Sequence, residues 1–312
     1  MRRLALLALA ALAAGPAPGQ GAGSPFTVVE TGQSFRRLQE AVDAIGDRAG
    51  TIRIAPGRHY DCAVQERGRV AFVAAQAGTA VFERTTCEDK ATLVLRGQGA
   101  RVEGIVFKNL EVADGNGAGI RLETGDLDVV NAMFLDSQSG ILSADDPSSR
   151  ITIDRTTFSG LGKDPTGNGA HGIYIGEYAS LRVTNSRFER GTGGHYLKNR
   201  APKIEVLDSS FDDSRGRTTN YMIDLSNGAS GRIAGNEFVV GRDKDNYSTM
   251  ITVAPEGVRN SSEGLVVENN SARLAPGVDF KTVFVGAWTG EPVTVRGNRL
   301  GAGISERARR WM

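Results

Sequence analysis

The segments Val129-Val130-Asn131-Ala132-Met133-Phe134 and Val183-Thr184-Asn185-Ser186-Arg187-Phe188 share the pattern that decides the fold. Each begins with a β-branched aliphatic residue, has a turn-prone residue two positions later, and ends on phenylalanine. Related segments recur along the chain at steps of 27, 24, 30, 23, 27, 34 and 28 residues, and the last two end on Ala272 and Leu300 instead. The eight copies begin at Val102, Val129, Ile153, Val183, Val206, Ile233, Val267 and Val295.

Each repeat also holds a second short segment with alternating apolar residues, such as Gly172-Ile173-Tyr174-Ile175. Repeats of this length, with short strands and no helical stretch between them, indicate a solenoid. The Leu/Asn skeleton of leucine-rich repeats is absent, and propeller blades run to about 40 residues or more. We therefore predict an all-β fold, a right-handed parallel β-helix with the phenylalanines stacked inside. The recurring Asn131, Asn185, Asp208 and Asn269 are expected at turns with left-handed backbone angles.

The N-terminal region divides into a targeting segment and the start of the domain. A basic start, an apolar stretch at Leu4–Ala14 and a Gly/Pro break are typical of a secretory signal peptide. We assign residues 1–23 to this signal peptide and its linker, and residues 24–312 to one β-helix domain. The apolar residues of Ser34–Ile45 recur with helical spacing behind a serine, which predicts a short helix that caps the open end of the solenoid.

Composition excludes several classes of protein. Lys and Arg number 37 against 36 Asp and Glu, so the net charge of +1 gives no strong attraction to nucleic acid or to anionic membranes. A hydrophobic fraction of 40% excludes wholesale disorder. No apolar run reaches the ~18 residues that span a bilayer. We expect a periplasmic or secreted monomer without a transmembrane segment.

The two cysteines fit that compartment. Cys62 and Cys87 are 25 residues apart, close to the length of one repeat. Residues one coil apart in a stacked solenoid lie ~4.8 Å from each other, which suits a disulfide. A Cys62–Cys87 bridge is therefore predicted, with two free buried thiols as the alternative.

Two N-terminal motifs resemble a known family. The motif Phe35-x-x-Leu38-Gln39-x-Ala41-Val42-x-Ala44 is followed by Ile52-x-Ile54-x-Pro56-Gly57-x-x-Tyr60. Together with the repeats, this resembles secreted bacterial β-helix proteins of the pectate-lyase-like superfamily, and most closely an uncharacterised single-domain group. The resemblance implies a carbohydrate-related role, because most enzymes of that superfamily cleave or epimerise acidic polysaccharides. The motifs of polygalacturonases, pectin methylesterases and calcium pectate lyases are not matched.

Few residues in this chain are suited to catalysis. His171 and His195 are 24 residues apart and open equivalent strands of consecutive coils, so they should lie on neighbouring rungs. Lys198 and Arg200 follow His195, and Tyr174 lies in the preceding coil. A base and cations are what proton abstraction beside a uronate carboxylate requires. We predict these five residues as the catalytic set, with His195 as the base, kept neutral because the two cations lower its pKa. The inserted loops Leu161–Ala170 and Gly241–Thr249 are expected to flank them.

Four further residues are predicted to bind substrate: Asp224, Asn199, Tyr196 and Glu177. The register at Lys198 has two alternatives. An alignment with Ile175 would turn the amine inward, and a one-residue bulge, which we favour because an unpaired buried lysine is costly, would turn it outward. A structural role for the whole cluster is the alternative. No cofactor or metal is predicted: Asp114, Asn116, Asp126, Asp128, Asp145 and Asp146 match no calcium loop, so calcium binding has no motif to support it.

Three functions are compatible with these residues. The first is a lyase acting on an acidic, uronate-containing polysaccharide. The second is an epimerase or glycoside hydrolase that uses the same groove. The third is a non-catalytic β-helix that binds glycan or forms a surface scaffold.

Overall fold

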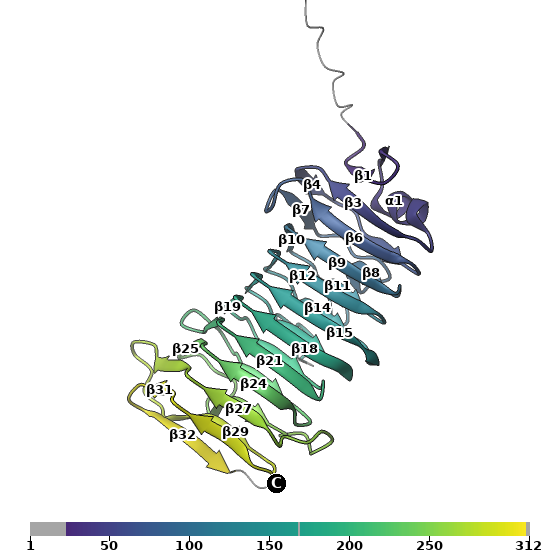
Figure 1. The fold of residues 1–312 in the computed structure, drawn as a ribbon. Coiled ribbons are helices and arrows are strands. Elements are labelled where there is room, and N and C mark those ends of the chain that lie inside the picture. Colours follow the sequence, from purple (N-terminus) through teal and green to yellow (C-terminus); the bar gives the residue numbers. More distant parts are fainter. Residues whose placement is uncertain (1–22, 168, 310–312) are drawn as a thin grey trace, which may run out of the picture.

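The computed structural model describes residues 23–167 and 169–309, which form one elongated solenoid of stacked coils (Figure 1). The predicted signal peptide, up to residue 22, lies outside the described residues. Most coils contribute one strand to each of three sheets, here called A, B and C. From β3 onward, neighbouring strands in every sheet come from successive coils and run parallel. The predicted parallel β-solenoid is therefore confirmed.

Sheet A begins with an antiparallel pair, β2 and β1, and then follows the coils. Its strands are, in spatial order, β2 (Gln33–Phe35), β1 (Phe26–Val28), β3 (Ala49–Ile54), β6 (Arg69–Ala74), β9 (Gly99–Glu103), β12 (Asp126–Val130), β15 (Asp146–Asp154), β18 (Tyr178–Thr184), β21 (Lys203–Leu207), β24 (Ser230–Ala234), β27 (Leu265–Glu268) and β30 (Val293–Arg296).

Sheets B and C complete each coil. The strands of sheet B are β4 (Gly57–His59), β7 (Ala80–Glu83), β10 (Ile105–Lys108), β13 (Met133–Leu135), β16 (Thr157–Ser159), β19 (Arg187–Glu189), β22 (Ser210–Asp212), β25 (Glu237–Val240), β28 (Ser271–Leu274) and β31 (Arg299–Leu300). The strands of sheet C are β5 (Ala63–Gln65), β8 (Ala91–Leu95), β11 (Ala118–Leu122), β14 (Ser139–Ser143), β17 (Ile173–Ile175), β20 (Leu197–Asn199), β23 (Ile223–Leu225), β26 (Thr249–Val253), β29 (Thr282–Ala287) and β32 (Ile304–Arg309).

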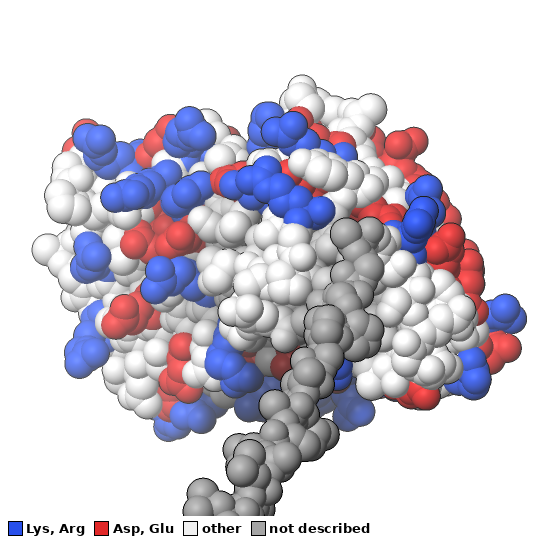
Figure 2. All heavy atoms as spheres, turned by 90° about the horizontal axis from the view of Figure 1, so that it is seen from above, with Lys and Arg blue, Asp and Glu red and all other residues white. Residues whose placement is uncertain are grey.

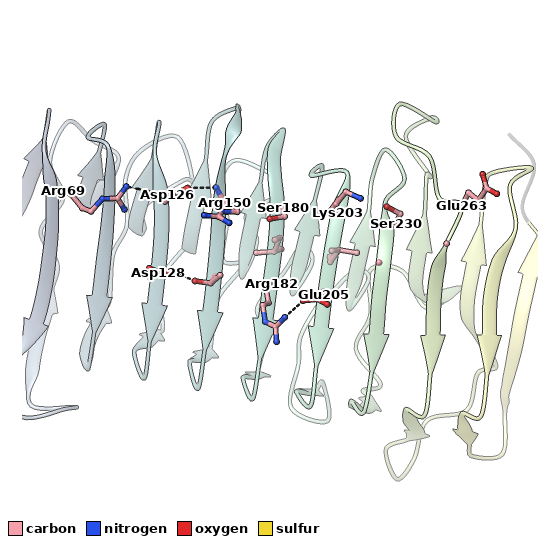
Figure 3. Close-up of a pocket in the computed structure, with 15 residues that line it drawn as sticks. Arg69, Asp126, Asp128, Arg150, Ser180, Arg182, Lys203, Glu205, Ser230 and Glu263 are labelled. Carbon is pink, nitrogen blue, oxygen red and sulfur yellow. Dashed lines mark hydrogen bonds and ion pairs between the residues drawn. The ribbon is translucent and has the colours of Figure 1, made fainter. Parts of the chain in front are cut away.

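Side chains at equivalent positions lie one above the other from coil to coil. Figure 3 shows this for sheet A, where Asp126, Arg150, Ser180 and Lys203 follow one another at one level of successive strands. Because alternate residues of a strand point to opposite faces, one row of a sheet fills the core and the next faces outward.

The predicted phenylalanine stack lies in the interior of sheet B. Phe107, Phe134, Phe158, Phe188, Phe211 and Phe238 are each at most 1% exposed. Phe158 stacks at 5.0 Å between ring centroids on Phe134 and at 4.9 Å on Phe188. The chain entering sheet C passes close to these rings, so a Cβ added at Gly119 would lie 2.5 Å from Phe134. Glycine is therefore required there for close approach.

The corner between sheets A and B combines a strained turn with a buried polar ladder. Asn131, Asn185, Asp208 and Asn269 have φ angles of 51°, 50°, 50° and 55°, as predicted for left-handed turn residues. After Asn185, Asp208 and Asn269 the next residue points inward, and its side chain accepts a hydrogen bond from a backbone N–H one coil earlier. The ladder satisfies N–H groups that sheet pairing cannot reach. It begins at the backbone N–H of Thr156, and its accepting side chains are Ser186, Ser209, Asn236, Asn270 and Asn298.

The predicted helix is shorter than expected. Helix α1 spans Leu38–Ile45 and buries Leu38, Ala41, Val42 and Ile45 against the first strands. The expected cap was wrong, because Ser34 lies in β2, where its hydroxyl is 2.8 Å from that of Thr27 on β1. Instead, Asp61 accepts the Leu38 N–H at 2.9 Å.

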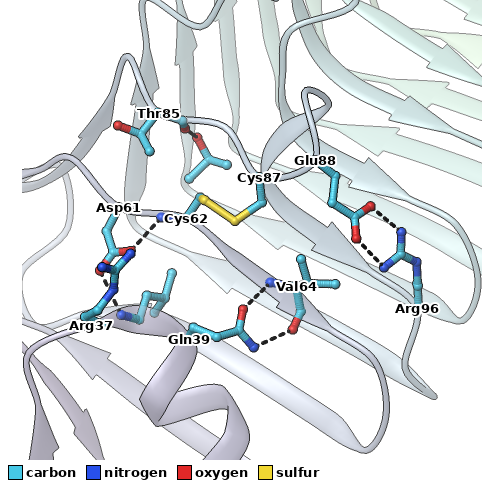
Figure 4. Close-up of a disulfide and its surroundings, with 11 residues drawn as sticks. Arg37, Gln39, Asp61, Cys62, Val64, Thr85, Cys87, Glu88 and Arg96 are labelled. Carbon is cyan, nitrogen blue, oxygen red and sulfur yellow. Dashed lines mark hydrogen bonds and ion pairs between the residues drawn. A yellow bond between two sulfur atoms is a disulfide. The ribbon is translucent and has the colours of Figure 1, made fainter.

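The predicted disulfide joins Cys62 and Cys87, whose Cα atoms are 5.6 Å apart (Figure 4). It ties the segment before β5 to the segment before β8. Gln39 of α1 binds both backbone groups of Val64 nearby, so the helix and the bridge fix the same early coils.

The surface carries charges of both signs. Figure 2 shows Lys and Arg interspersed with Asp and Glu on the face it displays, in keeping with the net charge of +1. No helix within the described ranges has the length and apolar character needed to cross a bilayer.

The phenylalanine stack should carry much of the stability. We expect Phe158→Ala to lower the free energy of unfolding by about 3–5 kcal/mol, because it removes a ring packed on both sides. Urea unfolding followed by circular dichroism measures this. Val258→Ala, at a side chain 52% exposed, is the control and should cost less than about 0.5 kcal/mol. An equal loss of unfolding free energy in the two variants would contradict a stabilising role for the phenylalanine stack.

The disulfide should contribute on the order of 3 kcal/mol, because it closes a loop of 25 residues in the unfolded chain. The double variant Cys62→Ser, Cys87→Ser should unfold at lower urea concentration than the oxidised protein. Reduction of the unaltered protein should lower its midpoint equally. A midpoint that reduction leaves unmoved would show that the bridge adds nothing to stability.

Candidate functional site

The site lies on the outward face of sheet C. In the three-residue strands β17, β20 and β23 the two outer residues point into the core, so the middle residue points outward, and in β26 Thr252 lies likewise between the buried Ile251 and Val253. Pairing places Tyr174, Lys198, Asp224 and Thr252 in register, and we call these four residues the central row.

The strand register decides which way Lys198 points. Lys198 pairs with Tyr174, not with Ile175, so it faces outward without any bulge. The amine is nevertheless almost covered, with the side chain 9% exposed. A lysine in that position needs a partner, because an unpaired buried charge is costly.

Asp224 supplies one partner of Lys198. Its Oδ2 lies 3.2 Å from Lys198 Nζ and accepts a hydrogen bond from Ser226 Oγ at 2.9 Å. Its Oδ1 accepts from Thr252 Oγ1 at 2.9 Å. Asp224 is 1% exposed and is held by these hydrogen bonds, so it fixes the position of the Lys198 amine. This position does not fit the predicted direct contact with substrate.

The second partner is Glu256, which sequence reasoning missed. One carboxylate oxygen bonds Lys198 Nζ, and the other accepts from Arg200 Nη2 at 2.6 Å. Burial raises the pKa of Glu256, but the hydrogen bonds from Lys198 and Arg200 outweigh it and lower the pKa below its usual range. The carboxylate is charged at neutral pH and 41% exposed. Lys198, Arg200 and Glu256 form what we call the carboxylate clamp.

Arg200 is held in place by neighbours from two coils. Its Nε donates to the hydroxyl of Tyr174 at 2.8 Å, and its Nη1 donates to Asn227 Oδ1 at 2.5 Å. The guanidinium carbon also lies 5.7 Å from the centre of the Tyr174 ring. The sequence singled out Tyr174 and Arg200 but not Asn227.

Glu256 reaches the clamp because the loop of residues 254–264 folds back over earlier coils. The Arg259 N–H donates to the carbonyl of Asn227 at 3.0 Å, and Arg259 Nη1 lies 3.1 Å from Glu177 Oε1. Glu177 thus anchors the loop at the rim of the site, 44% exposed. The coil of 34 residues was the one signal in the sequence that could have pointed to this loop.

His171 and His195 lie on neighbouring rungs, as predicted from their spacing. Their Nδ1 atoms are 3.3 Å apart, and the His195 backbone N–H donates to His171 Nδ1 at 3.1 Å. His195 Nε2 lies 3.4 Å from Asp224 Oδ2. Tyr221 continues the column, with its ring centre 5.3 Å from that of His195.

Both histidines are neutral at neutral pH. Burial lowers the pKa of His195 to about 3, and the positive charge of Lys198 adds to the effect. Burial, then His195 and Lys198, likewise lower the pKa of His171 to about 3. The predicted direction of the His195 pKa shift agrees with this. Burial is the largest cause, and the cations that add to it are Lys198 and Lys244 rather than Lys198 and Arg200.

Two predicted substrate-binding residues lie away from this face. Asn199 points into the core, is 0% exposed, and bonds the carbonyl of Ala201 at 2.9 Å. Tyr196 is 4% exposed, and its hydroxyl donates to Asp213 Oδ1 at 2.6 Å. Lys244 completes that cluster, 3.3 Å from Asp213 Oδ2. Both side chains are therefore in positions that stabilise the coils and cannot meet a ligand on sheet C.

The predicted flanking loops do border the site. The first loop, which ends at Ala170, leads directly into His171, and Asn246 in the segment before β26 donates to the Tyr221 hydroxyl at 2.8 Å. In residues 23–167 and 169–309, no three His, Cys, Asp or Glu side chains are grouped to hold a metal ion.

Comparison with solved structures found distant likenesses, each at 11% sequence identity. The pectin methylesterase of Aspergillus niger has a TM-score of 0.46 and covers 92% of this chain and 87% of its own. ORF18 of Geobacillus virus E2 has a TM-score of 0.41 and covers 87% and 56%. The Streptococcus pneumoniae surface protein and adhesin PfbA has a TM-score of 0.36 and covers 87% and 94%.

A search of the curated proteins found no match to this sequence. The model of the right-handed β-helix region matches residues 118–300, which is more than half of the 312 residues. That match confirms the predicted handedness of the solenoid. With its three parallel sheets and this match, the protein belongs to the right-handed β-helix family.

Proposed function

We propose that this protein is a carbohydrate-active β-helix protein, and that it acts as a lyase on an acidic polysaccharide at the outward face of sheet C. The observation that carries the proposal is the carboxylate clamp. Lys198 and Arg200 already hold one carboxylate, that of Glu256, between an ammonium and a guanidinium. A uronate carboxylate has the same charge and shape, so it can replace Glu256 when the 254–264 loop moves aside.

The clamp supplies what proton abstraction beside a carboxylate needs. Cations bound to the carboxylate lower the energy of the negative charge that develops when the neighbouring C–H proton leaves. Asp224 keeps the Lys198 amine in position for this role. Without such neutralisation, a carbon beside a carboxylate is a very weak acid.

His195 is the proposed base. His171 Nδ1 accepts the His195 backbone N–H, so it is unprotonated and can also accept a hydrogen bond from a protonated His195 Nδ1. In that tautomer His195 Nε2 is free to take the substrate proton. Asp224 Oδ2, 3.4 Å away, then stabilises the imidazolium that forms.

The elimination balances with Tyr174 as the acid. The C5–H proton passes to His195, its electron pair forms the C4=C5 double bond, and the C4–O bond breaks. The departing oxygen takes the hydroxyl proton of Tyr174, whose oxygen already accepts a hydrogen bond from Arg200 Nε. The products are an unsaturated uronate and a new free sugar hydroxyl.

A non-catalytic glycan-binding role is the second candidate. It is favoured by the full set of internal partners around Lys198, Arg200 and His195. A surface built only to bind would keep this network intact on binding. Product formation separates the two functions.

Two further proposals concern the setting of the site. Helix α1 covers the first coil and acts as its cap, because its buried face packs on β1, β3 and β5. The disulfide favours work in an oxidising compartment, the periplasm or outside the cell.

His195→Ala should abolish formation of unsaturated product from polygalacturonate or alginate, followed by ultraviolet absorbance, while the circular dichroism spectrum stays that of the parent. Because burial keeps the pKa of His195 near 3, the parent's rate should not fall between pH 7 and about pH 5, where an ordinary histidine would become protonated.

Three outcomes test this assignment. Retained product formation in His195→Ala excludes the histidine as base. Unfolding of that variant identifies a structural rung residue, and His195→Gln then tests the base alone. Exchange of the C5 proton with deuterium from solvent, without absorbance, identifies an epimerase.

The clamp should control affinity in both directions. Lys198→Ala should weaken binding of oligogalacturonate about tenfold and flatten its salt dependence, because one of two cations is lost. Glu256→Gln should tighten binding, because the internal competitor loses its charge. Isothermal titration calorimetry in the His195→Ala background measures both without turnover.

The matched control is Lys108→Ala on sheet B, a cation 39% exposed and 3.8 Å from Asp136. It should leave affinity unchanged. An equal loss of affinity in Lys108→Ala and Lys198→Ala would show that the binding depends on overall charge and not on the clamp.

A further inference from the structure

A separate hollow of about 760 Å³ lies on the outward face of sheet A. Its lining runs across successive coils from Arg69 on β6 to Gly264 just before β27. Figure 3 shows this course from Arg69 to Glu263. None of the residues of the sheet C site lines it. We call this hollow the sheet A groove.

The floor of the groove follows from strand register. Arg150, Ser180, Lys203 and Ser230 occupy one row of β15, β18, β21 and β24. Long cationic and short hydroxyl side chains alternate along that row, so each serine leaves a notch beside a cation. Gly231, which follows Ser230, keeps the far end open.

The two cations of this row are not paired with the carboxylates beside them in the described residues. Asp126, next to Arg150, accepts its backbone N–H at 2.9 Å, while Asp126 Oδ2 lies 3.7 Å from Arg69 Nη2. The row below is internally paired, with Asp128 bonded to Thr152 and Arg182 bonded to Glu205. Within the described part of the chain, neither Arg150 nor Lys203 forms a side-chain ion pair. Both are exposed, so their charges are available to a ligand.

The spacing of these cations suits a polymer. Arg150 and Lys203 lie two strands apart, ~9.6 Å by the usual distance between strands. Two anionic groups on a single extended chain can therefore each meet one of these cations. Ser180, between them, and Ser230 offer hydroxyls to the parts of the chain that carry no charge.

Four carboxylates in the groove argue against a densely charged ligand. Asp126, Asp128, Glu205 and Glu263 also line it, so a nucleic acid or an acidic peptide would meet repulsion along its length. A polysaccharide with widely spaced anions and many hydroxyls meets cations at two points and hydrogen-bond acceptors between them.

We propose that the sheet A groove is a second binding site, which holds an extended acidic polysaccharide with one anionic group on Arg150 and another on Lys203. This goes beyond the function proposed for sheet C and does not require that sheet C be catalytic. Its effect is to keep a long chain on the protein's surface while another stretch of it is free to reach the other sheet.

The test compares full-length variants for binding of size-fractionated oligogalacturonate and oligoalginate by calorimetry. In the His195→Ala background, Arg150→Ser with Lys203→Ser should weaken binding of long oligomers at least tenfold and reduce the salt dependence. The matched control is Lys108→Ser with Arg187→Ser on sheet B, which makes the same charge change at exposed positions outside both sites. It should leave binding unchanged.

The outcomes separate the two proposals. If the groove variant with His195 intact still forms product from short oligomers, the groove is independent of the sheet C site. If the parent forms no product but the groove variant loses binding, the proposed lyase fails and the groove proposal stands. Unchanged binding in the groove variant, an equal loss in the control, or no binding of either oligomer by the parent overturns it. Polyglutamate bound as tightly as the oligouronates would assign the groove to acidic peptides.

Discussion

The whole structure depends on in-register stacking of parallel strands from one coil to the next. A strand that pairs in register must present the same face as the strands above and below it, because a slip of one residue reverses every side chain. The core therefore repeats: Ile120, Ile141 and Ile173 are paired neighbours on sheet C, and phenylalanines stack along sheet B. The polar ladder at the corner locks this register, since each side chain bonds the backbone of the adjacent coil.

Stacking that constrains the inward rows leaves the outward rows free to carry chemistry. The three-residue strands β17, β20 and β23 each offer a single central position on the outer face of sheet C, so a site there must be assembled from several coils. Tyr174, Lys198, Asp224 and Thr252 come from four strands, yet the register brings them together without any special loop. The energetic limit is burial of charge: Lys198 is tolerated because Asp224 lies beside it, and Asp224 because it accepts several hydrogen bonds.

Sequence could predict what depends on periodicity. The repeat gave the solenoid, the phenylalanine stack, the left-handed corner residues and the disulfide one coil apart, since each follows from counting along one chain. Sequence reasoning was wrong where it had to decide which individual residue of a strand points inward and which points outward. Asn199 and Tyr196 stand in a polar segment that suggests a surface, but the strand turns Asn199 inward and the tight entry into sheet C buries Tyr196. The prediction of Ser34 as a helix cap was wrong because Ser34 lies in β2, which pairs antiparallel with β1.

Glu256 could not have been found by counting, because its position depends on a loop that returns across earlier coils. The local sequence Ala254-Pro255-Glu256-Gly257 indicates a turn and nothing more. Arg259 holds this loop against the earlier coils: its backbone N–H donates to Asn227, in the coil of β23, and its guanidinium contacts Glu177, in the coil of β17. The same loop carries Glu263 and Gly264 to the edge of the sheet A groove. One insertion thus touches both outward faces, with Glu256 at the clamp and Glu263 at the edge of the groove.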